Sequence, residues 1–236
     1  MKSKRACWFA LSLGLLGMLI FSQAANASLL APGTTLPPDI FPACVGCTLD
    51  AFLNSGPITV SNGQGITITF DLVSAVYSDP SNPFGAGNLD FVYQVTNVSG
   101  NDFIGRLTVG VFSGFMTDVG FTATGSALPG GLFVDGTQAP QLVSRSTALN
   151  QGATVGFIYN ALAPSTFAPG TTSTALIVET DATNLAPGNL NVIDDVVGST
   201  AAFEPAVRTV APEPASLLLL GSGLLALGTR IRRSRA

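Results

Sequence analysis

The chain has 236 residues, of which 47% are hydrophobic and only 10% charged, and its formal net charge is −4. Seven of the ten basic residues lie near the two ends, so residues 28–211 hold three arginines, thirteen acids and a net charge of about −10. This acidic middle region excludes nucleic-acid binding, which needs Lys and Arg to displace phosphate counterions. The absence of histidine excludes Ser-His-Asp and Cys-His catalysis and histidine metal sites.

The first 27 residues have the three parts of a secretory signal peptide. A basic start is followed by an apolar run over residues 6–21 and then by small residues that include Ala25 and Ala27. The Ala-x-Ala pattern predicts cleavage after Ala27, which makes residues 1–27 a signal peptide with a helical apolar part. A retained membrane anchor is the alternative interpretation.

Residues 28–57 are rich in Pro and Gly and have little regular pattern, which predicts an extended lead-in. Its one notable motif is Cys44-Val-Gly-Cys47. An exported domain meets oxidising conditions, which favour a disulfide between Cys44 and Cys47 as a local clip. Free thiols and a redox-active pair are the alternatives, whereas a zinc site would need further ligands that the chain lacks.

From residue 58 onward, short segments alternate apolar with small polar residues, the period-two pattern of strands. They cover residues 65–77, 88–97, 104–112, 119–123, 154–159, 173–180 and 190–193, and Gly, Pro and Asn turns separate them. In the second segment, one face carries Leu89, Phe91, Tyr93 and Val95. The pattern predicts an all-β fold, a single antiparallel β-sandwich ectodomain over residues 58–205, followed by a linker at 206–211.

The predicted domain offers few candidates for chemistry. Asp79 and Asp90 flank an oxygen-rich loop, and carboxylate, amide and carbonyl oxygens are the ligands that Ca²⁺ prefers. They are therefore weak calcium candidates, with an ordinary turn as the alternative. Four aromatic residues are candidates either for stacking on sugars or for the sheet core: Tyr77, Phe84, Phe91 and Tyr93. No cofactor is predicted.

The last 25 residues contain three ordered elements. Pro212, Glu213 and Pro214 form an extended strip, and residues 215–229 form an apolar run of about 22 Å if helical. Four arginines close the chain: Arg230, Arg232, Arg233 and Arg235. The run is shorter than the hydrocarbon core of about 30 Å, which predicts a short transmembrane helix that serves as a transient anchor, with the arginines on the cytoplasmic side. An amphipathic or buried helix is the alternative.

This C-terminal segment, residues 212–236, resembles the PEP-CTERM sorting signal in its Pro-Glu-Pro strip, its Leu/Gly-rich stretch and its closing arginine cluster. The resemblance implies processing near the strip by exosortase, an integral-membrane cysteine protease or transpeptidase of Gram-negative bacteria that make exopolysaccharide. It also implies an intermediate anchored in the inner membrane, followed by transfer to the cell surface or release.

These observations lead to three hypotheses of function. The first is a non-enzymatic protein of the cell surface or extracellular matrix, sorted by exosortase and associated with exopolysaccharide and biofilm. The second is a secreted carbohydrate- or calcium-binding module. The third is a secreted hydrolase with paired carboxylates, which would need two acids in one cleft.

Overall fold

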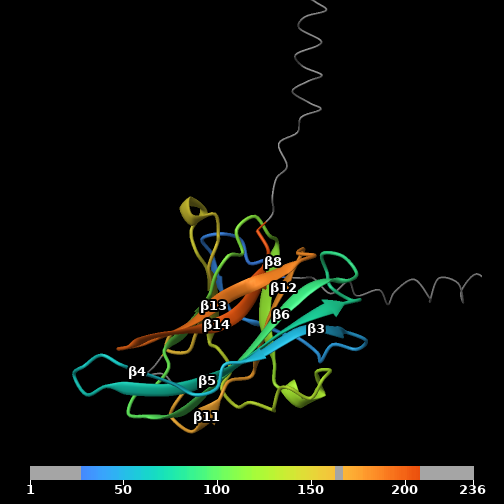
Figure 1. Ribbon diagram of the computed structural model, residues 1–236. Helices are drawn as coiled ribbons and strands as arrows, with labels where there is room; N and C mark the ends of the chain where they lie inside the picture. Colours follow the sequence, from blue (N-terminus) through green and yellow to red (C-terminus); the bar gives the residue numbers. More distant parts are fainter. Residues whose placement is uncertain (1–27, 163–166, 208–236) are drawn as a thin grey trace, which may run out of the picture. The chain divides into compact units, whose positions relative to one another are not determined.

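A computed structural model describes residues 28–162 and 167–207, which form a two-layered β structure (Figure 1). The first compact unit of the chain ends at Ala206. The helical elements in the described ranges are two 3₁₀ turns, η1 (Gly125–Ala127) and η2 (Ala148–Asn150), so the all-β prediction is confirmed. The predicted signal helix and C-terminal helix lie outside the described residues. Within the described residues, no helix is long and apolar enough to cross a bilayer.

One layer is a six-stranded antiparallel sheet with the order β1-β9-β10-β7-β13-β14. Its strands are β1 (Thr35–Leu36), β7 (Arg106–Val109), β9 (Leu142–Arg145), β10 (Val155–Ile158), β13 (Leu185–Ile193) and β14 (Val197–Pro205). The long hairpin β13–β14, orange to red in Figure 1, forms one edge of this sheet.

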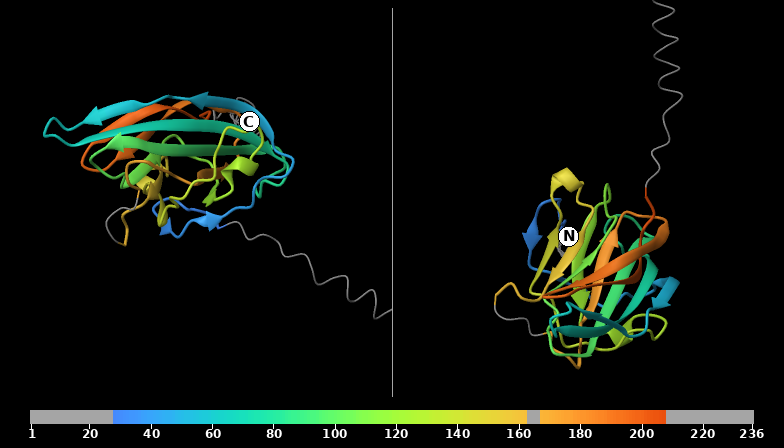
Figure 2. Two further views of the ribbon diagram at one scale, coloured as in Figure 1. Left: turned by 90° about the horizontal axis from the view of Figure 1, so that it is seen from below. Right: turned by 60° about the vertical axis from the view of Figure 1, so that its left-hand side comes forward.

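The other layer is an eight-stranded sheet with the order β2-β8-β12-β6-β5-β3, in which β11 also pairs with β6 and β4 with β5. Its strands are β2 (Asp39–Ile40), β3 (Thr48–Asn54), β4 (Ile58–Ser61), β5 (Thr67–Asp79), β6 (Asn88–Gly100), β8 (Thr117–Thr122), β11 (Thr171–Thr172) and β12 (Ala175–Thr180). The long strands β5 and β6 run side by side (Figure 2). The prediction of a purely antiparallel sandwich needs one correction, because β2 pairs with β8 in parallel.

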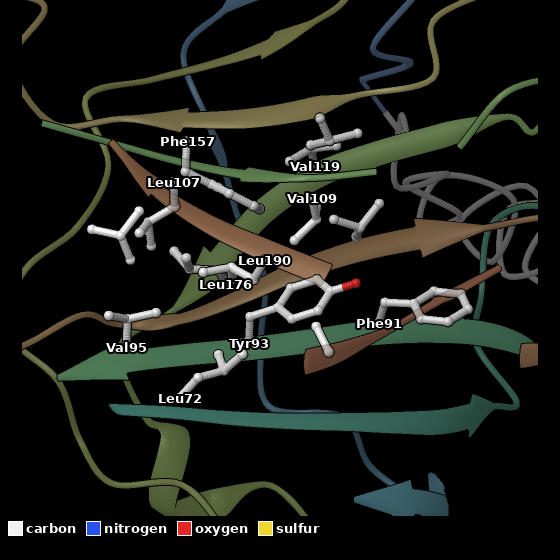
Figure 3. Close-up of a cluster of buried hydrophobic side chains, with 14 of the residues drawn as sticks. Leu72, Phe91, Tyr93, Val95, Leu107, Val109, Val119, Phe157, Leu176 and Leu190 are labelled. Carbon is white, nitrogen blue, oxygen red and sulfur yellow. The ribbon is translucent and has the colours of Figure 1, made fainter. Parts of the chain in front are cut away.

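The core lies between the two sheets, where their apolar faces meet (Figure 3). The four apolar residues predicted to share one face of β6 all point into this core, since each is at most 4% exposed. From the six-stranded sheet, Leu107, Val109, Phe157 and Leu190 pack against it. The Tyr93 hydroxyl donates a 2.6 Å hydrogen bond to the Phe203 carbonyl, which ties β6 to β14 across the core.

The segment 28–57 differs from the extended lead-in predicted from its composition. It contributes β1, β2 and β3, which pair with β9, β8 and β5 respectively, and so enters both sheets. Two of these strands have only two residues, too few for a periodic pattern, and in β3 the side chains alternate only between exposed and half-buried.

Strand β14 was not predicted because its buried positions hold small residues, including Gly198 and Ala202. A Cβ atom on Gly198 would lie 2.8 Å from the Phe70 ring, so the packing of that ring requires glycine here. A strand whose inward side chains are this small lacks the alternation of large apolar residues on which sequence prediction depends.

Candidate functional site

A row of carboxylates crosses the outer face of the eight-stranded sheet, the face turned away from the core. Glu179 of β12 lies directly opposite Asp118 of β8 on one side and Asp90 of β6 on the other. Directly opposed residues of paired strands project from the same face and come within about 5.5 Å, where like charges destabilise the sheet. Three acids side by side in adjacent strands would therefore repel one another when ionised, and the fold must offset this repulsion.

Two further acids extend the row at its ends. Asp79, the last residue of β5, groups with Asp90 and Glu179, and one oxygen of each lies within 4.8 Å of the others. At the other end, Asp39 of β2 interacts with Asp118. Gly120 permits this approach, because a Cβ atom at that position would collide with the Asp39 backbone. We call these five residues, Asp39, Asp79, Asp90, Asp118 and Glu179, the acidic row.

The acidic row is mostly buried although it lies outside the main core. Asp79, Asp90 and Asp118 are 3%, 4% and 2% exposed, and Glu179 is half-buried. A cleft of about 250 Å³ lies beside Asp79, Asp90 and Glu179, and residues 41–45 also line it. A segment that composition predicted to be a lead-in therefore lines the cleft beside three of the five acids.

Few hydrogen-bond donors reach these acids. Asp79 Oδ1 accepts 2.7 Å bonds from the Ser81 backbone N–H and hydroxyl, and Asp90 Oδ1 accepts a 2.8 Å bond from Asn82 Nδ2. Asp118 Oδ2 accepts a 3.1 Å bond from the Ser28 backbone N–H, whereas its Oδ1 has no partner in the described structure. These donors therefore satisfy only some of the carboxyl oxygens of the acidic row.

The electrostatic consequence is that three acids of the row have raised pKa values. Burial is the largest cause, and the neighbouring carboxylates add to it, so the pKa of Asp90 rises to about 9 and the pKa of Glu179 to about 8. Burial and Asp39 raise the pKa of Asp118 to about 7. A row of this kind can take up protons or a cation.

The two arginines in the described ranges are engaged elsewhere. Arg145 donates hydrogen bonds to the carbonyls of Leu30, Phe112, Phe115 and Gly152 and to the Thr117 hydroxyl. Arg106 donates to the Ser144 hydroxyl at 3.0 Å. The described residues contain no lysine, so the acidic row has no lysine to neutralise it.

The structure brings Asp79 and Asp90 together, as a calcium site would require, and adds Glu179 to them. Sequence analysis missed Glu179, Asp118 and Asp39. The sequence does mark Glu179, because it is the one acid inside an otherwise apolar strand. No local signal could have found Asp39, whose place depends on the parallel pairing of β2 with β8.

Cys44 and Cys47 form a disulfide in the structure, with their Cα atoms 5.8 Å apart. Cys44 Sγ lies 3.3 Å from Asp79 Oδ1. This is a packing contact, because a disulfide sulfur has no proton to donate. The disulfide thus lies against Asp79, at one end of the acidic row.

Three of the four aromatic candidates for sugar stacking are unavailable for that role. Tyr77, Phe91 and Tyr93 are at most 1% exposed, so they belong to the cores on the two faces of the sheet. Tyr77 also donates a 2.8 Å hydrogen bond to the Pro129 carbonyl. Phe84 is half-buried.

The C-terminal sorting residues and the predicted cleavage site at Ala25 and Ala27 lie outside the described residues. There, a family model described as the PEP-CTERM protein-sorting motif matches residues 210–233, which confirms the predicted resemblance. No curated protein and no solved structure matches the chain.

An all-β domain followed by this motif defines an exported protein that is targeted to exosortase. The chain is accordingly a carrier of the PEP-CTERM sorting motif, which implies a membrane-anchored intermediate and delivery to the cell surface.

Proposed function

We propose that this chain is a non-enzymatic protein of the cell surface or extracellular matrix, associated with exopolysaccharide and biofilm after exosortase processing. The sorting motif at residues 210–233 is the observation that carries the proposal. The strongly acidic region 28–211 also supports it, because such a surface stays soluble in an anionic polymer layer and avoids nonspecific adhesion. The processing signals are Pro212, Glu213, Pro214 and the four C-terminal arginines.

Cell fractionation with and without the sorting enzyme tests the proposal. We expect the chain in the medium and outer surface of normal cells, and unprocessed in the inner membrane when the enzyme is deleted. Glu213→Ala should cause the same retention, whereas the matched control Asp135→Asn, an exposed acid of the β domain, should be released normally. Unchanged release of the Glu213 variant would contradict the role of the motif.

The non-enzymatic part of the proposal needs its own test, because the structure does place acids beside a cleft. Its volume of about 250 Å³ is below the 300–1,000 Å³ that small-molecule sites usually occupy, and Asp79 and Asp90 are almost fully buried. We expect no release of reducing sugars from exopolysaccharide by the shed protein. Hydrolysis that disappears in Asp90→Asn would favour the hydrolase hypothesis instead.

A second function, calcium binding, is favoured by one observation. Asp79, Asp90 and Glu179 offer three oxygens within 4.8 Å of one another. The described residues contain no lysine that could neutralise these acids. Oxygen-rich sites of extracellular modules bind Ca²⁺ with dissociation constants of about 10⁻⁴–10⁻³ M. Because binding displaces protons from Asp90 and Glu179, affinity should rise between pH 6 and pH 9.

Calorimetric titration of the shed, EDTA-treated protein with CaCl₂ tests this second function. We expect binding heat and a higher Tm, both lost in Glu179→Gln and retained in the control Asp135→Asn. No heat and no change in Tm at millimolar Ca²⁺ would contradict calcium binding at these three acids.

A further inference from the structure

The chain is fixed to the β domain immediately after the predicted cleavage site. Leu29 forms an isolated antiparallel bridge with Asp118, and the Leu30 N–H donates a 2.9 Å bond to the Thr117 carbonyl. The Leu30 side chain is 1% exposed and belongs to the main core. Its carbonyl accepts from both Arg145 and Thr117. Cleavage after Ala27 would therefore leave a new end that is already held in place.

The first residue of that new end lies against the acidic row. The Ser28 nitrogen is 3.1 Å from Asp118 Oδ2. Asp118 is 2% exposed, and its Oδ1 accepts no hydrogen bond in the described structure. The titratable groups that face Asp118 are also carboxyl groups, Asp39 from β2 and Glu179 from β12. A buried carboxylate among carboxylates is stabilised by a cation or a proton, and this one has a backbone nitrogen beside it.

We propose that the α-ammonium group of Ser28, created when the signal peptide is removed, is the structural counter-ion of Asp118 and completes the acidic row. The proposal rests on the export proposed above and on the predicted cleavage after Ala27. In the cleavage, water adds across the bond between the Ala27 carbonyl carbon and the Ser28 nitrogen. Ala27 leaves as a carboxylate, and the Ser28 nitrogen gains protons to become –NH₃⁺.

The cleavage changes what this nitrogen can do. In the uncleaved chain it is a neutral amide with one N–H. After cleavage it has a full positive charge and three donors, so it can serve Asp118 Oδ2 and the unpartnered Oδ1 or Asp39. Hydrogen bonds between charged groups are about twice as strong as neutral ones. Processing therefore stabilises the end of the row formed by Asp118 and Asp39, and the domain reaches full stability only once exported.

The sequence makes this group unusually easy to observe. The chain has two lysines, Lys2 and Lys4, and both lie in the predicted signal peptide. After cleavage, the α-amino group of Ser28 is the only primary amine in the polypeptide. An acylating reagent attacks only the unprotonated form of this amine, so the rate at which it modifies this single position, followed by mass spectrometry as a function of pH, reports the pKa of the unmodified group.

The test is to measure the pKa of this amine in the processed protein collected from cells. An unpaired α-amino group has a pKa of about 7.7–8.0, and an opposite charge at this distance raises it by about one or more, to roughly 9. Asp118→Asn should return the pKa to the unpaired range, while the control Asp135→Asn should leave it raised. If Asp118→Asn does not fold, two other measurements of the amine pKa remain. The pKa in the unaltered protein should be about 9, and in Asp39→Asn, which keeps Asp118, it should stay above the unpaired range.

The outcomes separate the pairing from the processing on which it rests. A protein that retains residues 1–27, or begins elsewhere than Ser28, overturns both the predicted cleavage and the ion pair. A protein that begins at Ser28 and has an amine pKa of about 8 overturns the ion pair alone. A raised pKa that survives Asp118→Asn in a folded protein also overturns it, because another group would then be the partner.

Discussion

The two faces of the eight-stranded sheet are built from alternate residues of the same strands, yet they differ in chemistry, because the outer face joins a smaller apolar cluster to the acidic row. Towards the core, β6 and β12 present Phe91, Tyr93 and Leu176, which pack against the other sheet (Figure 3). On the outer face, the same two strands present Asp90 and Glu179, which loops cover. Because one backbone separates the faces, the sheet can be stabilised on one side and carry a cluster of acids on the other.

The largest effect should come from the inner face. Phe91 is fully buried, and its ring meets Phe112 edge-on with centroids 5.9 Å apart. Phe91→Ala should lower the free energy of unfolding by about 3–5 kcal/mol, measured by urea denaturation of the shed protein. The control Phe52→Ala removes a ring that is 59% exposed and should change it by about 0.5 kcal/mol. Equal losses would contradict the assignment of the core to this face.

The second-largest loss of stability should come from changing a buried charge whose hydrogen bonding is complete. Arg145 is 6% exposed and makes five hydrogen bonds, in contrast to the partly satisfied acids of the outer face. Arg145→Lys keeps the charge but loses the planar fork, so we expect a loss of about 3 kcal/mol in the same denaturation. Arg106→Lys, the matched control, should cost less. A tolerated Arg145→Lys would show that charge alone suffices.

The outer face should give a pH dependence of intermediate size. The pKa of Asp90 is raised to about 9 in the folded protein, so between about pH 4 and pH 9 the unfolded chain releases a proton that the folded one keeps. In EDTA, the Tm should therefore fall as pH rises from 5 to 8. Asp90→Asn should flatten this fall. A Tm that rises over this interval would contradict the burial of the acids.

The same measurement of Tm against pH has an internal control in Asp135, whose pKa is shifted in the opposite direction to that of Asp90. Hydrogen bonds from Ser126 lower the pKa of Asp135, so its contribution to stability is present at neutral pH and is lost as pH falls through the acid range. Asp135→Asn should leave the slope between pH 5 and pH 8 unchanged.

The smallest effect should come from the disulfide. The loop between Cys44 and Cys47 is very short, so reduction should cost about 2 kcal/mol or less. After signal removal these are the only cysteines, because Cys7 lies within residues 1–27. Without reductant, a thiol reagent should therefore label nothing. Ready labelling of Cys44 or Cys47 would remove the disulfide from the account.

The inner face could be predicted well from the sequence and the outer face only poorly, for a physical reason. The inward face of β6 follows from period-two alternation of large apolar residues, which any sheet of this kind requires. The acidic row depends on register between strands that are distant in the chain, such as β8 with β12. Asp79 and Asp90 were found because they are neighbours across one turn. Asp39 and Ser28 needed the fold itself, because two-residue strands and isolated bridges leave no periodic pattern.

The most direct test of the whole account is the intact mass of the protein shed from cells, measured without reductant. We predict one species that begins at Ser28, ends near Pro212 and is lighter by two hydrogens than its reduced form. A shed protein with the mass of all 236 residues would contradict the processing at both ends.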